Sequence, residues 1–295
     1  MNKAFRFLAI CTTSVALATL SIAWAQSYTT YDFPGATATT LNGGPSPQGT
    51  SVGSWTDTGG VIHGFTLTKH GVATSFDPPG STLTTPNFIS PQGTIVGGYN
   101  DAGGVSHGFV LDGGQYTIVN FPGANGTTLS GINPSGEMSG FSCSDPACGT
   151  TGNATTNHSF TVSKHGGFTS FDPPGAVSSQ ASTVNPSGAV VGAYTDSGAV
   201  THGYLYYHGT FTTIDFPGAV FTFAGGNNPS GAIVGAYTDT AGVTHSFLLN
   251  NGTFTSFDPP GAVGFSDASG INPGGVIVGI YFDSAVKEHG FIRTP

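Results

Sequence analysis

Short runs of alternating apolar and polar residues, separated by turns rich in Gly, Pro and Asn, extend along the chain from about residue 26. No stretch there keeps the 3.6-residue period of an amphipathic helix. The segment 222–258 shows the pattern, with Asn228-Pro229-Ser230-Gly231 placed as a type I turn and Asn250-Asn251-Gly252 as a tight hairpin. The strands predicted in this segment are 222–227, 232–238, 244–249 and 253–258. The pattern therefore predicts an all-β protein.

This four-strand pattern repeats along the chain. Each copy ends in a tag of Asp or Asn, then Phe or Pro, then Pro-Gly, and the tags begin at Asp32, Asp77, Asn120, Asp172, Asp215 and Asp258. The tags are 45, 43, 52, 43 and 43 residues apart. Proline cannot continue a hydrogen-bonded ladder, so the tag marks the end of the fourth strand. Four strands in about 40–45 residues are typical of one blade of a β-propeller.

The last copy supplies three strands and no tag, and the missing strand and tag stand at residues 28–35. Pairing of this N-terminal strand into the last blade would remove an exposed sheet edge. We therefore predict a single domain, 26–295, folded as a six-bladed β-propeller of four-stranded blades whose ring is closed by the N-terminal strand. The expected repeats are 36–80, 81–123, 124–175, 176–218, 219–261, and 262–295 joined to 28–35.

The first 25 residues have the features of a secretory signal peptide. Lys3 and Arg6 precede a largely apolar stretch, and Ala23-Trp24-Ala25 fits the small-x-small cleavage rule. A transmembrane anchor is the alternative, but the stretch is short and contains Ser and Thr. We expect cleavage after residue 25, no membrane insertion afterwards, and a periplasmic or extracellular location.

The net charge of the chain limits the kinds of partner that we expect it to bind. Without Lys3 and Arg6 the chain has four Lys and Arg residues against fifteen Asp and Glu, and charged residues make up only 7% of the sequence. An acidic, sparsely charged surface does not attract phosphate backbones, which argues against a nucleic acid partner. A surface of hydroxyl and amide groups suits neutral partners such as sugars. We expect a monomer that contacts an extracellular glycan or protein.

The third repeat departs most from the others. It is nine residues longer than its neighbours and contains Cys143 and Cys148. In an exported chain such a pair predicts a disulfide, whereas zinc would need further ligands and only His158 is near. Long loops on rigid scaffolds often bind ligands, so the candidate binding loop comprises Glu137, Asp145, Asn153 and Asn157. A tolerated insertion at a hairpin tip is the alternative interpretation.

An Asp precedes a His by six residues in five repeats. The pairs are Asp57 and His63, Asp101 and His107, Asp196 and His202, Asp239 and His245, and Asp283 and His289; the third repeat has Ser144 and His158 instead. Residues that flank a short hairpin loop face each other, so we expect an Asp–His hydrogen bond to hold each hairpin. Metal binding or acid–base chemistry is the alternative, but catalysis needs one assembled site rather than a ring of similar hairpins.

The second strand of each repeat carries a glycine, followed two residues later by an aromatic residue in five repeats. The glycines are Gly53, Gly97, Gly140, Gly192, Gly235 and Gly279, and the aromatics are Trp55, Tyr99, Tyr194, Tyr237 and Tyr281. A glycine inside a strand indicates close approach of another backbone, expected here between neighbouring blades. We expect the aromatic rings to pack in the core, and a sugar-stacking surface is the alternative.

Three segments carry a family resemblance: Gly131-Ile132-Asn133-Pro134-Ser135-Gly136, Ile233-Val234-Gly235-Ala236-Tyr237, and His245-Ser246-Phe247-Leu248-Leu249 followed by Asn251-Gly252. They resemble the HAF repeats of bacterial extracellular proteins, although Gly or Ser replaces the Ala after His and the Asp-Pro-Pro-Gly tag is distinctive. The resemblance covers nearly all of the chain after the signal. It implies an exported, propeller-like protein of unassigned activity and supplies no catalytic residues.

No nucleophile–base arrangement, paired-glutamate spacing, His-Glu-x-x-His or phosphate loop occurs in the sequence. We therefore favour a non-enzymatic binding or surface-interaction protein with no cofactor. The first alternative is a metal-dependent hydrolase or lactonase with Ca²⁺ in the propeller channel, for which Asp267, Asn227 and Asn272 are the candidate ligands. The second alternative is a structural extracellular component.

Overall fold

The computed structural model describes residues 26–145 and 156–295, so the predicted signal peptide, 1–25, lies outside the described residues. The described ranges consist of β-strands joined by turns, and they contain no helix that is long and apolar enough to cross a membrane. The prediction of an all-β chain is confirmed for this part of the sequence.

The strands follow one another at short intervals. The first eight after the N-terminal strand β1 (Ser27–Tyr31) are β2 (Ala38–Gly43), β3 (Ser51–Thr56), β4 (Ile62–Leu67), β5 (Ala73–Phe76), β6 (Leu83–Ile89), β7 (Ile95–Asn100), β8 (Ser106–Asp112) and β9 (Gln115–Val119). The next eight are β10 (Gly126–Ile132), β11 (Met138–Cys143), β12 (Asn157–Val162), β13 (Phe168–Ser170), β14 (Ala176–Val184), β15 (Val190–Asp196), β16 (Thr201–Tyr207) and β17 (Thr210–Ile214). The last are β18 (Phe221–Asn227), β19 (Ile233–Thr238), β20 (Thr244–Asn250), β21 (Thr253–Phe257), β22 (Ser266–Ile271), β23 (Ile277–Phe282) and β24 (Glu288–Thr294).

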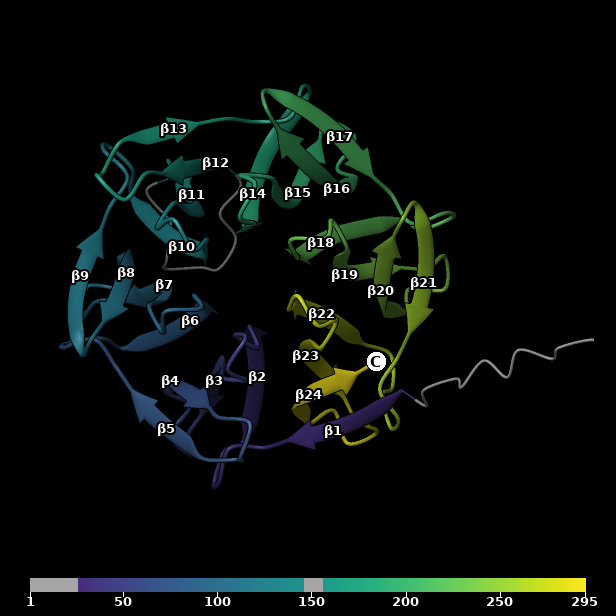
Figure 1. Cartoon of the computed structure of the whole chain (residues 1–295), viewed down its shortest axis with the longest axis horizontal. Helices are drawn as coiled ribbons and strands as arrows, with labels where there is room; N and C mark the ends of the chain where they lie inside the picture. The colour runs from purple at the N-terminus through teal and green to yellow at the C-terminus, as the bar shows by residue number, and fades with distance from the viewer. Residues whose placement is uncertain (1–25, 146–155) are drawn as a thin grey trace, which may run out of the picture.

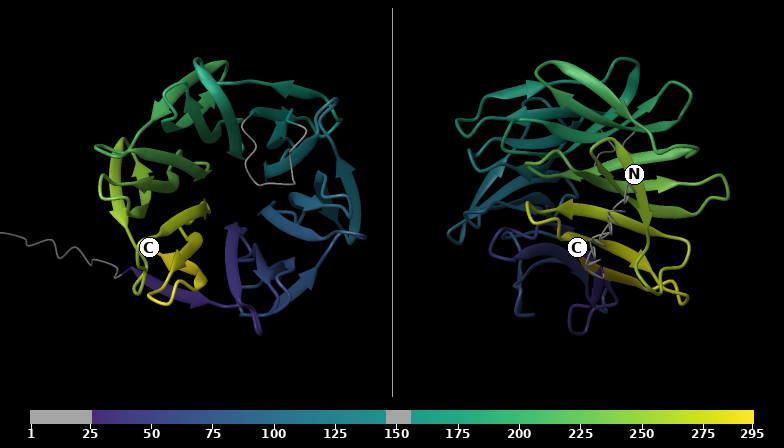
Figure 2. Two further views of the ribbon diagram at one scale, coloured as in Figure 1. Left: turned by 180° about the vertical axis from the view of Figure 1, so that it is seen from behind. Right: turned by 45° about the vertical axis from the view of Figure 1, so that its right-hand side comes forward.

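Consecutive strands pair antiparallel in groups of four. One four-stranded sheet is β10 to β13, and two eight-stranded sheets each join two such groups through a single parallel pair, Ile62 with Leu83 and Thr201 with Phe221. Figure 1 shows the groups arranged around a common centre, with β2, β6, β10, β14, β18 and β22 innermost. The views in Figure 2 show the same ring from behind and obliquely.

The N-terminal strand lies in the same sheet as the last three strands of the chain. β1 pairs antiparallel with β24 from Ser27 opposite Thr294 to Tyr31 opposite Gly290, and the sheet continues through β23 to β22. The Ser27 and Thr294 hydroxyls are 2.6 Å apart, and the Thr30 hydroxyl is 2.9 Å from the Tyr281 hydroxyl. The two ends of the described chain are thus held together by backbone and side-chain hydrogen bonds.

The core lies between neighbouring groups. Val52 of β3 packs with Ile89, Ile95 and Phe109 of the next group, and Val96 of β7 packs in the same way with Leu129 and Phe160. Each group therefore buries one sheet face against the next, in the manner of stacked sheets that exclude water from their apolar side chains.

The glycines of the second strands make a different contact from the one expected. A Cβ placed on Gly53 would lie 2.0 Å from the backbone oxygen of Thr40 and 2.9 Å from the Phe65 ring. Thr40 belongs to the inner strand of the same group, and the other five glycines approach the corresponding inner-strand oxygen. The expectation that neighbouring blades meet here is wrong. The inner-strand register shifts by one residue just beyond this contact, and this bulge crowds the paired strand.

Candidate functional site

A central cavity of about 400 Å³ is lined by all six innermost strands. In each of these strands the pairing with the second strand shifts by one residue, and the unpaired residue of the bulge lines the cavity. These residues are Asn42, Asn87, Ser130, Ser182, Gly225 and Ser269. Bulges often redirect a side chain beside a functional site. Here they bring three serine hydroxyls to one central space, together with two Asn side chains whose Nδ2 atoms donate to the Pro86 and Leu129 carbonyls of the neighbouring inner strands.

A second ring of positions lies two residues earlier in each inner strand. Half of these positions carry threonine, namely Thr40, Thr85 and Thr128. The other half, in three successive groups, carry Gln180, Phe223 and Asp267, and all three line the cavity. We call these three residues the arc. The arc places an amide, an aromatic ring and a carboxylate side by side in a ring that is otherwise hydroxyl-bearing.

Two smaller clefts adjoin the arc on either side of β18. A cleft of about 220 Å³ is lined by Gln180, Phe223 and Tyr194, among others. A cleft of about 250 Å³ is lined by Phe223, Asp267 and Phe265, among others. Both clefts share residues of the arc with the central cavity, so the arc borders three hollows.

Asp267 has an unusual environment. Its side chain lies among apolar and hydroxyl-bearing residues, and burial raises the pKa of its carboxyl from 3.8 to about 6. Its Oδ1 atom is enclosed and has no hydrogen-bond partner in the protein. A buried acceptor without a donor is unfavourable, so this oxygen is suited to accept a hydrogen bond from a ligand hydroxyl or ammonium group.

The three residues proposed as channel metal ligands are not brought together. Asn227 donates from Nδ2 to the Ala189 carbonyl and accepts from the Thr183 hydroxyl, and Asn272 Oδ1 accepts from the Val276 amide in its turn. Asp267 alone of the three lines the cavity. Within residues 26–145 and 156–295, no group of three or more His, Cys, Asp and Glu side chains could hold a metal ion.

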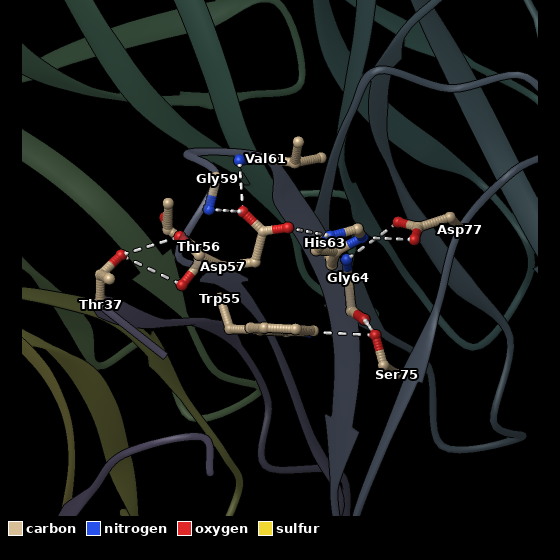
Figure 3. A network of polar contacts seen from close by, with 10 residues as sticks. All are labelled: Thr37, Trp55, Thr56, Asp57, Gly59, Val61, His63, Gly64, Ser75 and Asp77. Carbon is tan, nitrogen blue, oxygen red and sulfur yellow. Dashed lines mark hydrogen bonds and ion pairs between the residues drawn. The ribbon is translucent and has the colours of Figure 1, made fainter. Parts of the chain in front are cut away.

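Six histidines lie near the start of the third strands, beside the hairpins that join second and third strands. Figure 3 shows His63 between two carboxylates: Nδ1 is 2.7 Å from Asp77 Oδ2, and Nε2 is 3.6 Å from Asp57 Oδ2. Asp57 Oδ1 accepts hydrogen bonds from the Gly59 and Val61 amides, which fix the hairpin loop. The bond to Asp77 is the main reason why the pKa of His63 is raised above its ordinary value.

The same arrangement recurs around the ring. Each hairpin His places Nδ1 near the tag residue at the end of the fourth strand: Asp77, Asn120, Asp172, Asp215, Asp258 and Asp32. The hairpin Asp lies 3.2 Å from Nε2 at Asp283 and His289, 3.3 Å at Asp101 and His107, and 3.6 Å at Asp196 and His202 and at Asp239 and His245. Hydrogen bonds from loop amides lower the pKa of these hairpin carboxyls.

The expected Asp–His hydrogen bond forms at His107 and His289, but at His63, His202 and His245 the separation of 3.6 Å is too long for one. Sequence reasoning also missed the tag residue, which is the nearer partner. The signal was present, because a tag Asp or Asn follows five of the six histidines by 13 or 14 residues, and Asp32 serves the sixth from the other end of the chain. The third group has His158 beside Asp172 only, since Ser144 occupies the hairpin Asp position.

The second-strand aromatics stack on these histidines. Ring centroids are 4.8 Å apart for Trp55 and His63 and 5.1–5.2 Å apart in the other four groups. The opposite face of Trp55 is covered by Phe33 at 4.4 Å, and that of Tyr237 by Phe216 at 3.6 Å. With both faces covered, these two rings have the environment of packing residues rather than that of an open stacking surface.

The candidate binding loop of the third repeat is not assembled as one site. Glu137 precedes β11 and accepts from the Asn133 amide, whereas Asp145 follows β11 at its other end. Six residues of extended strand, about 20 Å, separate the two positions. Asn157 is only 3% exposed at the start of β12, and Asn153 lies outside the described residues.

Cys143 ends β11 and is 5% exposed. Its predicted disulfide partner, Cys148, lies outside the described residues, so the disulfide stays a prediction.

No protein-family model matches the chain. No curated protein matches it either. Solved structures do match, and they show the fold. The chain has a β-propeller fold. The Aleuria aurantia lectin, described as a six-bladed β-propeller with a novel mode of fucose recognition, is 12% identical with a TM-score of 0.51 over 86% of this chain and 90% of the lectin.

Two other structural likenesses are to proteins of different kinds. A putative TolB from Agrobacterium tumefaciens is 14% identical with a TM-score of 0.57, over 86% of this chain and 89% of that one. A catalytically inactive virginiamycin B lyase from Staphylococcus aureus, bound to quinupristin, is 11% identical with a TM-score of 0.52, over 92% of this chain and 100% of that one. At such identities the likenesses concern the fold alone.

Proposed function

We propose that this chain is an exported, non-enzymatic binding protein. It is a six-bladed propeller of four-stranded blades whose ring is closed by β1, and its central cavity binds a neutral polar ligand. A glycan is the ligand class that fits best. Export rests on the signal-like residues 1–25 and on the resemblance to HAF repeats.

The arc is the observation that carries this proposal. Ligand sites combine apolar or aromatic walls with a few polar groups that fix orientation. A sugar offers hydroxyls that can donate to Asp267 and accept from the Gln180 amide, and an apolar face that can pack on Phe223. The hydroxyl and amide groups at the bulges supply further contacts in the same cavity of about 400 Å³.

The lectin likeness supports a glycan ligand, since that propeller is described by its recognition of fucose. The lyase likeness raises an enzymatic alternative. Asp267 is the one carboxyl group among the described residues that line the central cavity, and no histidine lies with it. An acid–base pair would need a second titratable group in reach, so the described lining favours binding over catalysis.

The ring of His and Asp side chains has a structural role in this proposal. Each histidine links the hairpin between the second and third strands to the tag residue at the end of the fourth strand of the same blade. The six histidines are distributed around the propeller, one in each blade. Spread in this way, they stabilise blades individually and do not converge on one ligand.

The test is a glycan-array screen followed by calorimetric titration of the strongest ligand. We expect binding by the wild-type protein and at least tenfold weaker binding by Phe223→Thr, which inserts the residue that three other blades carry at this position. The control is Thr85→Ser, three positions from Phe223 in the ring of six and therefore opposite it, which keeps the hydroxyl and should bind like wild type. Equal affinity of Phe223→Thr and wild type would overturn the assignment of the site.

A further inference from the structure

An arginine occupies a core position on the third strand of the last group. Arg293 of β24 pairs with Ile277 of β23. In the other groups the residue at this register position is apolar or aromatic: Leu67, Leu111, Val162, Tyr206 and Leu249. A side chain that stays charged at every ordinary pH therefore replaces an apolar one between two groups.

Arg293 is buried without a counter-charge. It is 4% exposed, and its Nε has no hydrogen-bond partner. Its guanidinium carbon lies 4.5 Å from the centroid of the Phe257 ring. The one ion pair that a Lys or Arg forms within the described residues joins Lys287 to Asp32, far from this position. Attraction to one aromatic ring is weaker than the cost of removing a guanidinium from water, so an anionic partner is missing.

A cavity opens beside this guanidinium. It measures about 490 Å³ and is lined by Arg293 with Asn228, Ser230, Asn250 and the glycines Gly274 and Gly275. No Asp or Glu side chain belongs to the described lining, and the α-carboxylate of Pro295, which also lines it, forms no ion pair with Arg293 among the described residues. The cavity lies at the turns that follow β18 and β22, at the opposite ends of the strands from the Asp–His hairpins, and it shares no residue with the central cavity.

We propose that this cavity is an anion site in which Arg293 binds an oxyanion group, a carboxylate or a phosphate or sulfate. The planar guanidinium matches such groups with two parallel hydrogen bonds. The amide of Asn250, at the exposed rim, can donate a further bond, whereas the Ser230 hydroxyl already donates to Asn228 Oδ1. The site stands independently of the glycan proposal because the two cavities use different residues.

The experiment measures the melting temperature, Tm, in sodium phosphate, sodium sulfate or sodium acetate, with sodium chloride added to keep ionic strength constant. An anion that binds only the folded state should raise the Tm of the wild-type protein by about 3 °C for each tenfold increase above its Kd. Arg293→Leu, which inserts the residue found in three other groups, should abolish that dependence. Lys69→Ala, which removes an exposed cation, should respond like wild type.

The salts separate the possible sources of the anion. A response to acetate alone assigns a carboxylate ligand, and a response to phosphate or sulfate alone assigns a tetrahedral oxyanion. Sulfate and phosphate also stabilise proteins by exclusion from their surface, and the Arg293→Leu protein measures that contribution. A Tm response that persists in Arg293→Leu overturns the proposal. So does the absence of one-site binding when phosphate and acetate are titrated calorimetrically into the wild-type protein, a measurement that needs no variant.

Discussion

At the scale of single residues, Asp267 is a group whose placement favours ligand binding over stability. Threonine holds the equivalent position in three blades and has no charge to desolvate. Asp267 keeps an enclosed oxygen without a donor, and burial raises its pKa to about 6. Sites that bind polar ligands commonly retain such unfavourable groups, because the ligand supplies the missing hydrogen bond.

Replacing Asp267 by Asn should stabilise the protein without ligand in a pH-dependent way. Because the folded pKa of about 6 exceeds the ordinary 3.8, ionisation is penalised in the folded state. The penalty is small near pH 4, grows as the pH rises through 6, and is constant above it. We expect Asp267→Asn to raise the free energy of unfolding by about 1–3 kcal/mol at pH 7.5 and by much less at pH 4.

Urea denaturation of both proteins at the two pH values checks this expectation. An equal gain at pH 4 and pH 7.5 would contradict it, since a difference that does not depend on pH cannot come from ionisation of the carboxyl group.

At the scale of elements, the hairpins are held by a histidine between two acceptors of unequal strength. At His63 the tag residue Asp77 lies 2.7 Å from Nδ1, and the hairpin residue Asp57 lies 3.6 Å from Nε2. Asp57 is instead bound to the amides of its own loop. The hairpin Asp therefore fixes the conformation of the turn, and the tag Asp fixes the position of the histidine ring.

Asp77→Asn should therefore lower the pKa of His63 more than Asp57→Asn does. The raised pKa of His63 means that its pairing stabilises the fold fully below the unfolded pKa and that this contribution is lost as pH rises through the folded pKa. An NMR titration of the His63 ring protons in the wild type and the two variants measures the three pKa values. A larger decrease in Asp57→Asn would contradict this account of the hairpins.

Strands and turns could be predicted from the sequence because alternation and Pro-Gly punctuation are local signals. The partner of each histidine was harder to predict, because the tag lies one strand further along and its approach depends on the twist of the sheet. The strand glycines were assigned to the wrong neighbour for a similar reason. A bulge in the inner strand creates that contact, and no residue type in the sequence marks the bulge.

At the scale of the whole molecule, the pairing of β1 with β24 joins the two ends of the described chain. Asp32 at the end of β1 lies 2.7 Å from His289 Nδ1 and 3.3 Å from Lys287 Nζ, so side chains add to the strand ladder. Without β1, the edge of β24 would be open to solvent and to other chains.

Removal of residues 26–35 should thus destabilise the entire ring. We expect the Tm to fall by at least about 5 °C, with a tendency to aggregate, when the truncated protein is compared with one that begins at residue 26. Differential scanning calorimetry and light scattering measure the two effects. An unchanged Tm would show that the N-terminal strand adds nothing to the ring.

The position of the candidate site could be predicted only in part. From the sequence, Asp267 is a candidate metal ligand in the channel, whereas the expected binding loop is the insertion in the third repeat. The three residues of the arc differ from the threonine that the other three repeats carry at the same position. Whether residues at this position line the cavity depends on which inner-strand residues face the axis, and the bulges determine that.

The central claim is that the arc makes the cavity a ligand site. Its most direct test is calorimetric titration of the best array ligand into wild type and into a variant with Gln180→Thr, Phe223→Thr and Asp267→Thr, which makes this ring position threonine in every blade. We predict that the variant remains folded and loses at least a hundredfold in affinity. Wild-type affinity in this variant would contradict the claim and place the ligand elsewhere on the propeller.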